Sequence, residues 1–469
     1  MKRLTTFLAL FALVFLAAGA SKLNKLPVDA DVRIGTLPNG LTYYIRANET
    51  PANCADFFIA QRVGSVNEEE NQRGLAHFLE HMCFNGTRHF PGNSLIEYLE
   101  SIGVKFGANL NAYTSTDETV YNICDVPTTR QSSLDSCLLI LRDWSHDLTL
   151  ADADIDAERG VIKGEWRQRQ GTPTNRMLEK AAPVIYGNSL YGQRMPIGLM
   201  SVVENFPYDT LRDYYKRWYY PENQCVIVVG DVNPDVIEAK IKELWADVER
   251  PSFNVTPAKV EVPDNDKIIA TVQSDPEQVT PFVQIYLKHD NLPDSDVNTI
   301  NELRRDLACD LVVDMLAERL TDLETSTGTL MSNVGIGDRP FLLSRTRDAL
   351  MVRAGTSPGR EAECVNAIAA ELRRAARHGF TEVELQRAKL DERARLDRQF
   401  TARTKTTNTE YARTYVRHYL DGGALPSQEQ YYKMMKGVLG QVGPEQVNDY
   451  VRSVVNPDCR NVVLVAYLP

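Results

Sequence analysis

A helix, a turn and a strand occur twice in this chain, and this repeat constrains the fold more than any other feature. The segment 211–230 aligns without gaps on the segment 447–466, with Pro221 falling on Pro457. Two similar connections without a common origin would give the same alignment, but self-similarity at one fixed distance is typical of duplicated units. We therefore expect an α+β fold of two tandem, duplicated domains, each a mainly antiparallel sheet packed with helices.

The repeat and the local composition together predict the domain limits. The first copy is expected over 21–250 and the second over 266–469. Between them, 251–265 contains three prolines and is expected to be an extended linker. Residues 1–20 combine two early cations, an apolar run and an A-x-A site, which is the pattern of a secretory signal peptide. We expect a periplasmic or secreted protein with no membrane anchor after signal cleavage.

Composition excludes some classes of partner. The 469 residues carry a net charge of −11, whereas nucleic acids and anionic membranes favour basic surfaces. The eight cysteines include no C-x-x-C pair, so they do not predict a zinc finger, and a core of this size does not depend on a disulfide framework.

The strongest chemical signal is His77-Phe-Leu-Glu80-His81. Apolar residues at helical spacing surround it and Asn85-Gly86 follows it, so a helix is expected here. Imidazoles at i and i+4 share one helix face and can bind one zinc ion, while Glu80 beside them is placed to accept a proton from water. Cys83 points to about the opposite side and is not expected to be a ligand. This H-x-x-E-H order is a known metallopeptidase motif.

A third ligand is expected from another helix. Over 151–170, Glu158 and Glu165 share one helical stripe with Ile155 and Ile162. Acids on a stripe with apolar residues suggest a buried polar site, although a solvated charged helix would have a similar composition.

Four stretches of this sequence resemble the insulinase/pitrilysin family of zinc peptidases, and the bacterial coenzyme-PQQ-type branch in particular. They are GLAHFLEHMCFNGT, the region from FPGNSLIEYLE to STDETVYNI, ERGVIKGEW, and RWYYPENQCVIVVGDVN. The resemblance implies one zinc ion per chain, held by His77, His81 and Glu165, with Glu80 as general base. It also implies a supporting role for Glu158, which lies about 10 Å from Glu165 along a helix. The 84 positions between His81 and Glu165 are somewhat more than the family leads us to expect.

The family resemblance also indicates where a peptide would bind. The segment 107–121 looks like the edge strand beside the zinc helix, on which Asn111 and Ala112 match the positions that hold substrate. An unpaired edge can add a peptide as one more strand. An ordinary hairpin rich in Thr and Tyr would have the same composition.

The second copy is not expected to hold metal. In the second copy, the positions equivalent to His77, Glu80 and His81 are Val313, Leu316 and Ala317, at the same distance that separates Pro221 from Pro457. These residues offer no ligand.

The function that the resemblance implies is a zinc-dependent endopeptidase that hydrolyses oligopeptides or unfolded segments and works as a homodimer or heterodimer with a second family half. A non-catalytic peptide-binding subunit is the main alternative; a smaller, unduplicated thioether-cleaving zinc enzyme also carries H-x-x-E-H. For the arginine and tyrosine that relatives supply from their second half, Tyr411, Arg413 and Tyr415 are weak candidates, expected to be helix-surface residues.

Overall fold

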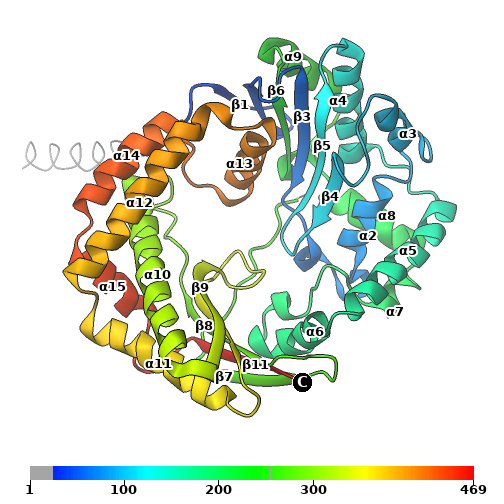
Figure 1. Cartoon of the computed structure of the whole chain (residues 1–469). Coiled ribbons are helices and arrows are strands. Elements are labelled where there is room, and N and C mark those ends of the chain that lie inside the picture. The colour runs from blue at the N-terminus through cyan, green and yellow to red at the C-terminus, as the bar shows by residue number, and fades with distance from the viewer. Residues whose placement is uncertain (1–24, 254) are drawn as a thin grey trace, which may run out of the picture.

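A computed structural model describes residues 25–253 and 255–469, so the predicted signal peptide at 1–20 lies outside the described residues. Two sheets organise the fold (Figure 1). The first has the order β1-β2-β6-β3-β5-β4, and the second has the order β7-β11-β8-β10-β9. The first-sheet strands are β1 Val32–Thr36, β2 Thr42–Ala47, β3 Cys54–Gln61, β4 Leu110–Thr114, β5 Thr119–Pro127 and β6 Gln224–Gly230. The second-sheet strands are β7 Ile269–Ser274, β8 Phe282–His289, β9 Met331–Pro340, β10 Asp348–Thr356 and β11 Val462–Leu468.

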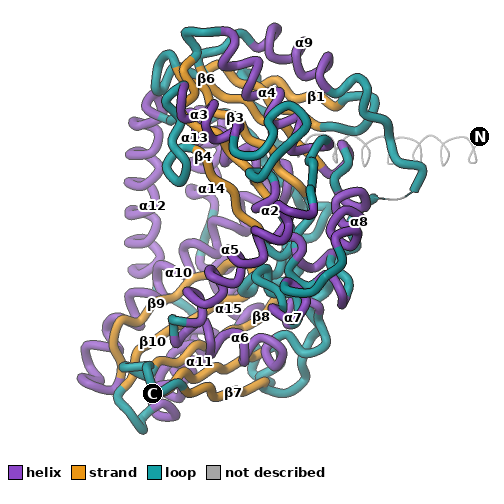
Figure 2. The backbone as a smooth tube through the Cα atoms, turned by 90° about the vertical axis from the view of Figure 1, so that its right-hand side faces the viewer, coloured by secondary structure: helices purple, strands orange, loops and turns teal. Residues whose placement is uncertain are grey.

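Helices surround both sheets. Those of the first half are α2 Leu75–Met82, α3 Ser94–Ser101, α4 Gln131–His146, α5 Asp152–Gln170, α6 Pro173–Ile185, α7 Met200–Val203, α8 Tyr208–Trp218 and α9 Pro234–Leu244. Those of the second half are α10 Ile300–Thr327, α11 Glu361–His378, α12 Glu382–Ala402, α13 Asn408–Asp421, α14 Gln428–Gln441 and α15 Pro444–Val454. Helix α12 runs along one side of the molecule (Figure 2).

The duplication is visible in the strand order. The sequence β2-β6-β3-β5-β4 corresponds strand by strand to β7-β11-β8-β10-β9. In each set the first pair is parallel and the three following pairs are antiparallel. Helices α8 and α15, which precede β6 and β11, begin and end at equivalent positions of the two copies. The predicted α+β fold of two duplicated, mainly antiparallel domains is therefore confirmed.

One helix of each half packs against the sheet of the other half. Helix α13 covers strands β3 and β6, and its Tyr415 and Tyr419 join a buried cluster with Phe58 and Ile227. Helix α6 in turn covers β7 and β11 (Figure 1). The expectation that Tyr415 is a helix-surface residue is therefore wrong, because this ring is buried against the first sheet. The exchange of helices fixes the two halves against each other.

The predicted linker at 251–265 falls between the strands of the two sheets, and the domain limits stay a prediction. All eight cysteines lie among the described residues and are free. Within 25–253 and 255–469, none of the helices combines the length and the apolar character that crossing a membrane requires.

Candidate metal centre

Helix α2 places both histidines of the motif on one face. Their rings lie with centroids 4.7 Å apart at an interplanar angle of 81°. The helix follows Gly74, whose φ of 110° lies in the left-handed region that glycine adopts without strain. The backbone N–H groups of Gly74 and Ala76 donate to the buried carboxyl group of Glu68, at 2.9 and 2.8 Å. These contacts satisfy free donors at the start of α2 and fix its direction.

Glu165 reaches the two histidines from helix α5. Its Oε2 lies 3.3 Å from His77 Nε2 and 3.5 Å from His81 Nε2. Its Oε1 accepts a hydrogen bond from Arg169 Nε at 3.0 Å. Hydrogen bonds with His77 and His81 hold the pKa of Glu165 well below its usual range, with a further contribution from Arg169. The carboxylate is thus kept charged where it meets the imidazoles.

These three residues fit a zinc ion. One ligand atom from each lies within 4.8 Å of the others, and no second such group of three occurs among the described residues. Tetrahedral zinc with bonds of about 2.0–2.1 Å would separate its ligands by roughly 3.3–3.4 Å, close to the two measured distances. Two neutral imidazoles and one carboxylate also form a donor set that proteins use for catalytic zinc.

Glu158 supports the site from further out. Its Oε1 lies 2.7 Å from His81 Nδ1, and its Oε2 accepts a hydrogen bond from Asn85 Nδ2 at 2.5 Å. This contact leaves Nε2 as the His81 nitrogen that faces Glu165. Burial lowers the pKa of His81, but the hydrogen bonds with Glu158 and Glu165 outweigh it and raise the pKa to about 9. In contrast, His77 Nδ1 is buried and has no hydrogen-bond partner among the described residues.

Glu80 faces the edge strand. Thr114 Oγ1, at the end of β4, donates to Glu80 Oε2 at 2.5 Å. The residue is 8% exposed. A carboxylate held in place by one hydroxyl group and otherwise shielded from bulk water is well arranged to accept and return a proton.

Asn111 and Ala112 lie in β4, the edge strand of the first sheet. Both are partly exposed, and β5 is the one strand with which β4 pairs in the described chain. An isolated bridge from Phe106 covers Leu110, at the beginning of the strand. The free edge therefore runs from Asn111 toward Thr114, which brings it next to Glu80.

No sequence pattern indicates that Glu118 joins the edge strand β4 to the second half of the chain. Glu118, in the turn after β4, accepts a hydrogen bond from Tyr113 at 2.6 Å and forms ion pairs with Arg345 and Arg417. These partners are 227 and 299 positions away along the chain. Glu68 was missed for a different reason, since it lies in an acidic run, 68–70, that has the composition of a solvated loop.

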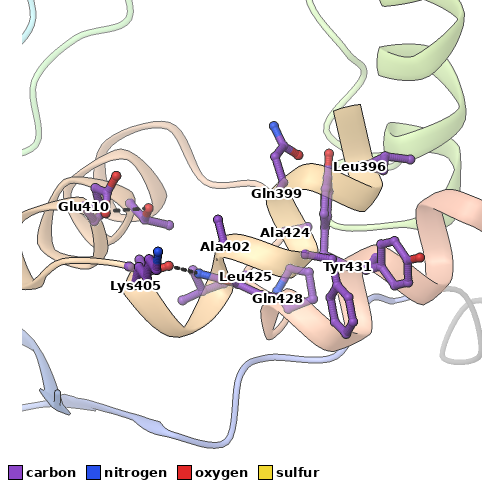
Figure 3. A pocket seen from close by; sticks show the side chains of 14 residues that line it. Leu396, Gln399, Ala402, Lys405, Glu410, Ala424, Leu425, Gln428 and Tyr431 are labelled. Atoms are coloured by element: carbon purple, nitrogen blue, oxygen red, sulfur yellow. Dashed lines mark hydrogen bonds between the residues drawn. The ribbon is translucent and has the colours of Figure 1, made fainter. Parts of the chain in front are cut away.

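The candidate metal centre does not coincide with a large pocket of the second half. A pocket of about 700 Å³ lies between α12, α13 and α14, and Figure 3 shows Gln399 and Tyr431 among its lining residues. Gln428 donates to Thr406 at its margin, at 2.8 Å. None of the residues discussed above lines this pocket, and within the described chain it contains no cluster of metal-binding groups.

Sequence comparison gives two family matches. The sequence model of the insulinase family (peptidase family M16) matches residues 45–192, and that of the peptidase M16 inactive domain matches residues 205–390. The chain is 33% identical over 386 residues to the "Probable zinc protease PqqL" of Escherichia coli, which covers 82% of this chain and 40% of that protein. It is 29% identical over 429 residues to the "Zinc protease PQQL-like" of Arabidopsis thaliana, covering 90% of this chain and 41% of that protein. The chain thus spans about two fifths of these relatives.

Structure comparison agrees with the sequence matches. The crystal structure of the first half of the periplasmic protease PqqL from Escherichia coli superposes with a TM-score of 0.84 and 28% identity, covering 95% of this chain and 93% of that chain. In the crystal structure of the whole PqqL, the match again has a TM-score of 0.84 and covers 94% of this chain and 48% of that chain. The similarity therefore extends over both sheets.

Proposed function

The chain belongs to the insulinase family, peptidase M16, and from that premise we propose that it is a zinc-dependent endopeptidase. The observation that carries the proposal is the convergence of His77, His81 and Glu165, with Glu80 on the same helix as the histidines. We propose His77, His81 and Glu165 as the ligands of one zinc ion per chain, with Glu80 as the general base and Glu158 as a positioning residue.

In this mechanism the protein residues hold the metal and move the proton. Zinc in this site supplies Lewis-acid chemistry, which lowers the pKa of water and polarises a scissile carbonyl. Glu80 accepts the proton of the attacking water and later donates it to the leaving amine. Glu158 holds the His81 ring in the orientation that leaves Nε2 free to bind. No side chain attacks the peptide, so no covalent acyl-enzyme forms.

The substrate is expected to be an oligopeptide or an unfolded segment. The free edge of β4 at Asn111 and Ala112 is suited to add an extended peptide through main-chain hydrogen bonds. Such bonds are common to all sequences, so the edge would tolerate many side chains. An oligopeptide or an unfolded segment can adopt the extended backbone that this pairing requires.

We also propose that the protein is periplasmic or secreted and acts with a second family half. The Escherichia coli relative is described as a periplasmic protease, and the chain matches about half of its structure. A homodimer or a heterodimer is the proposed form of this assembly. A non-catalytic partner subunit is the second candidate, favoured by the match of the inactive-domain sequence model to residues 205–390.

The proposal is tested with the purified protein and a mixed peptide library, with and without a metal chelator, followed by mass spectrometry of the products. Internal cleavage that the chelator abolishes and added zinc restores is the expected result. Peptide binding without any cleavage, in protein that contains stoichiometric zinc, would favour the non-catalytic subunit instead.

A further inference from the structure

A second pocket, of about 720 Å³, lies in the second half between the end of β8, the first turns of α10, and α15. Its lining carries an excess of positive charge, although the chain as a whole has a net charge of −11. The lining acids are Asp264, Asp290 and Asp449, and the cations are Lys288, Arg304, Arg305, Arg347 and Arg460. It shares no residue with the candidate metal centre.

Three of these cations form no ion pair with a carboxylate oxygen within 4.0 Å in the part of the chain that the structure describes, although Asp264 lies near Lys288, and Asp306 and Asp348 lie near Arg305. Lys288 Nζ donates to the carbonyl oxygen of Pro263 at 2.6 Å, and Arg305 Nη2 donates to the carbonyl oxygen of Asp290, also at 2.6 Å. The contacts of Arg304 are likewise uncharged, since it donates to side-chain amide oxygens, at 3.3 and 3.4 Å. Charged groups left unpaired in one pocket favour a ligand of opposite charge.

Lys288 makes the strongest case, because it is only 4% exposed. Burial lowers the pKa of its ammonium group to about 8; the neighbouring Arg347 contributes to the decrease and Asp264 partly opposes it. Arg347 itself is paired with Asp264 and Asp290, yet its Nε is buried without a hydrogen-bond partner among the described residues. A buried cation is costly without a counter-ion, and an anion in the pocket would stabilise it.

Side-chain contacts join the residues on one side of the pocket. His289 Nε2 lies 2.9 Å from Asp338 Oδ1, and Tyr450 donates a hydrogen bond to the same carboxylate. This cluster joins the ends of β8 and β9 to α15. A pocket with one side joined in this way and a volume within the usual range of small-molecule sites needs little rearrangement to bind a ligand.

We propose that this pocket binds a small dianion of the phosphate or dicarboxylate class, with Lys288, Arg304 and Arg305 as its cationic contacts. Guanidinium groups suit either anion, because their planar donors match the oxygen pairs of phosphate and carboxylate. The inference does not rest on peptidase activity.

Isothermal titration calorimetry on the full chain tests it, with inorganic phosphate and succinate as separate probes at constant ionic strength in sodium chloride. At least one anion should bind saturably, and the stronger of the two identifies the ligand class. Arg305→Gln and Lys288→Met should each weaken binding by at least about tenfold, the loss of one charged hydrogen bond. Arg398→Gln removes an exposed cation outside the pocket and should bind like the wild type.

Lys288→Met changes a buried position, so Arg305→Gln on a partly exposed residue provides an independent test. Thermal unfolding followed by circular dichroism shows whether each variant is folded. Absence of saturable binding of both anions to the wild type would overturn the inference. Unchanged affinity in folded Arg305→Gln, or an equal loss in Arg398→Gln, would also overturn it.

Discussion

His81 Nδ1 and Glu158 Oε1 lie 2.7 Å apart, so a carboxylate from α5 orients a histidine of α2. Glu158 also accepts a hydrogen bond from Asn85, just beyond the end of α2. This relationship links the two helices on which the proposed metal ligands lie, and it leads to the first prediction.

Glu158→Gln should lower zinc affinity or kcat by about 10–100-fold, the usual effect of removing a partner of a metal ligand. The amide has the same shape but cannot stabilise the histidine with a negative charge. Zinc affinity is measured by competition with a chromogenic chelator, and kcat with a fluorogenic peptide. Glu97→Gln, at an exposed position on α3, is the matched control. Wild-type values for both quantities would reduce Glu158 to an acid on a helix face.

His77→Ala and Glu165→Gln should each lose bound zinc, because two remaining ligands hold the ion too weakly. Metal content after dialysis, measured by atomic emission spectroscopy, checks this loss. Retention of one zinc ion per chain in both variants would show that the ligands have been wrongly assigned.

Glu68 should give the fold a specific pH dependence. Burial raises the pKa of Glu68 to about 8, against the opposing effect of the N–H groups of Ala76 and Gly74. The folded state therefore keeps a proton that the unfolded state, with a pKa near 4.3, releases. The contribution of this group to stability is present below about pH 4 and is lost as the pH rises through 8.

The variant Glu68→Gln removes this titration and one hydrogen-bond acceptor. Its melting temperature should lie below that of the wild type at pH 5, and the difference should shrink toward pH 8. Thermal unfolding across this range measures the difference. A constant gap between the two proteins would contradict the proton assignment.

Glu118 should couple the edge strand to the second half of the chain. Glu118→Gln leaves Arg345 and Arg417 with Asp421 as their one carboxylate partner among the described residues, which should cost about 1–3 kcal/mol of unfolding free energy. It also weakens the hydrogen bond that orients Tyr113 on the proposed substrate edge, where Arg417 remains as a donor to Tyr113, so KM should rise more than kcat falls. Urea unfolding and steady-state kinetics test the two effects. Unchanged stability together with unchanged KM would argue against this coupling.

The sequence predicts well what depends on local spacing. His77 and His81 share a face because they lie about one helical turn apart, and the repeat read from the sequence reappears as α8 and α15. The stripe on α5 likewise marks Glu158 and Glu165, and both approach the histidines.

Contacts between residues far apart in the chain cannot be predicted from the sequence pattern. The apolar stripes of α6 and α13 indicate that each helix covers something, but they do not say that each covers the sheet of the other half. In the same way, spacing alone places Glu158 about 10 Å from Glu165 but cannot show that it reaches the outer nitrogen of His81. Such contacts depend on the crossing of helices far apart in the chain.

The most direct test of the central claim is the turnover of Glu80→Gln with its zinc content measured on the same sample. The account predicts one zinc ion per chain and peptide cleavage reduced by several orders of magnitude, because the ligands remain and the proton acceptor is gone. Glu100→Gln, exposed on α3, should retain both zinc and activity. Zinc-loaded Glu80→Gln that cleaves peptides at nearly the wild-type rate would contradict the account.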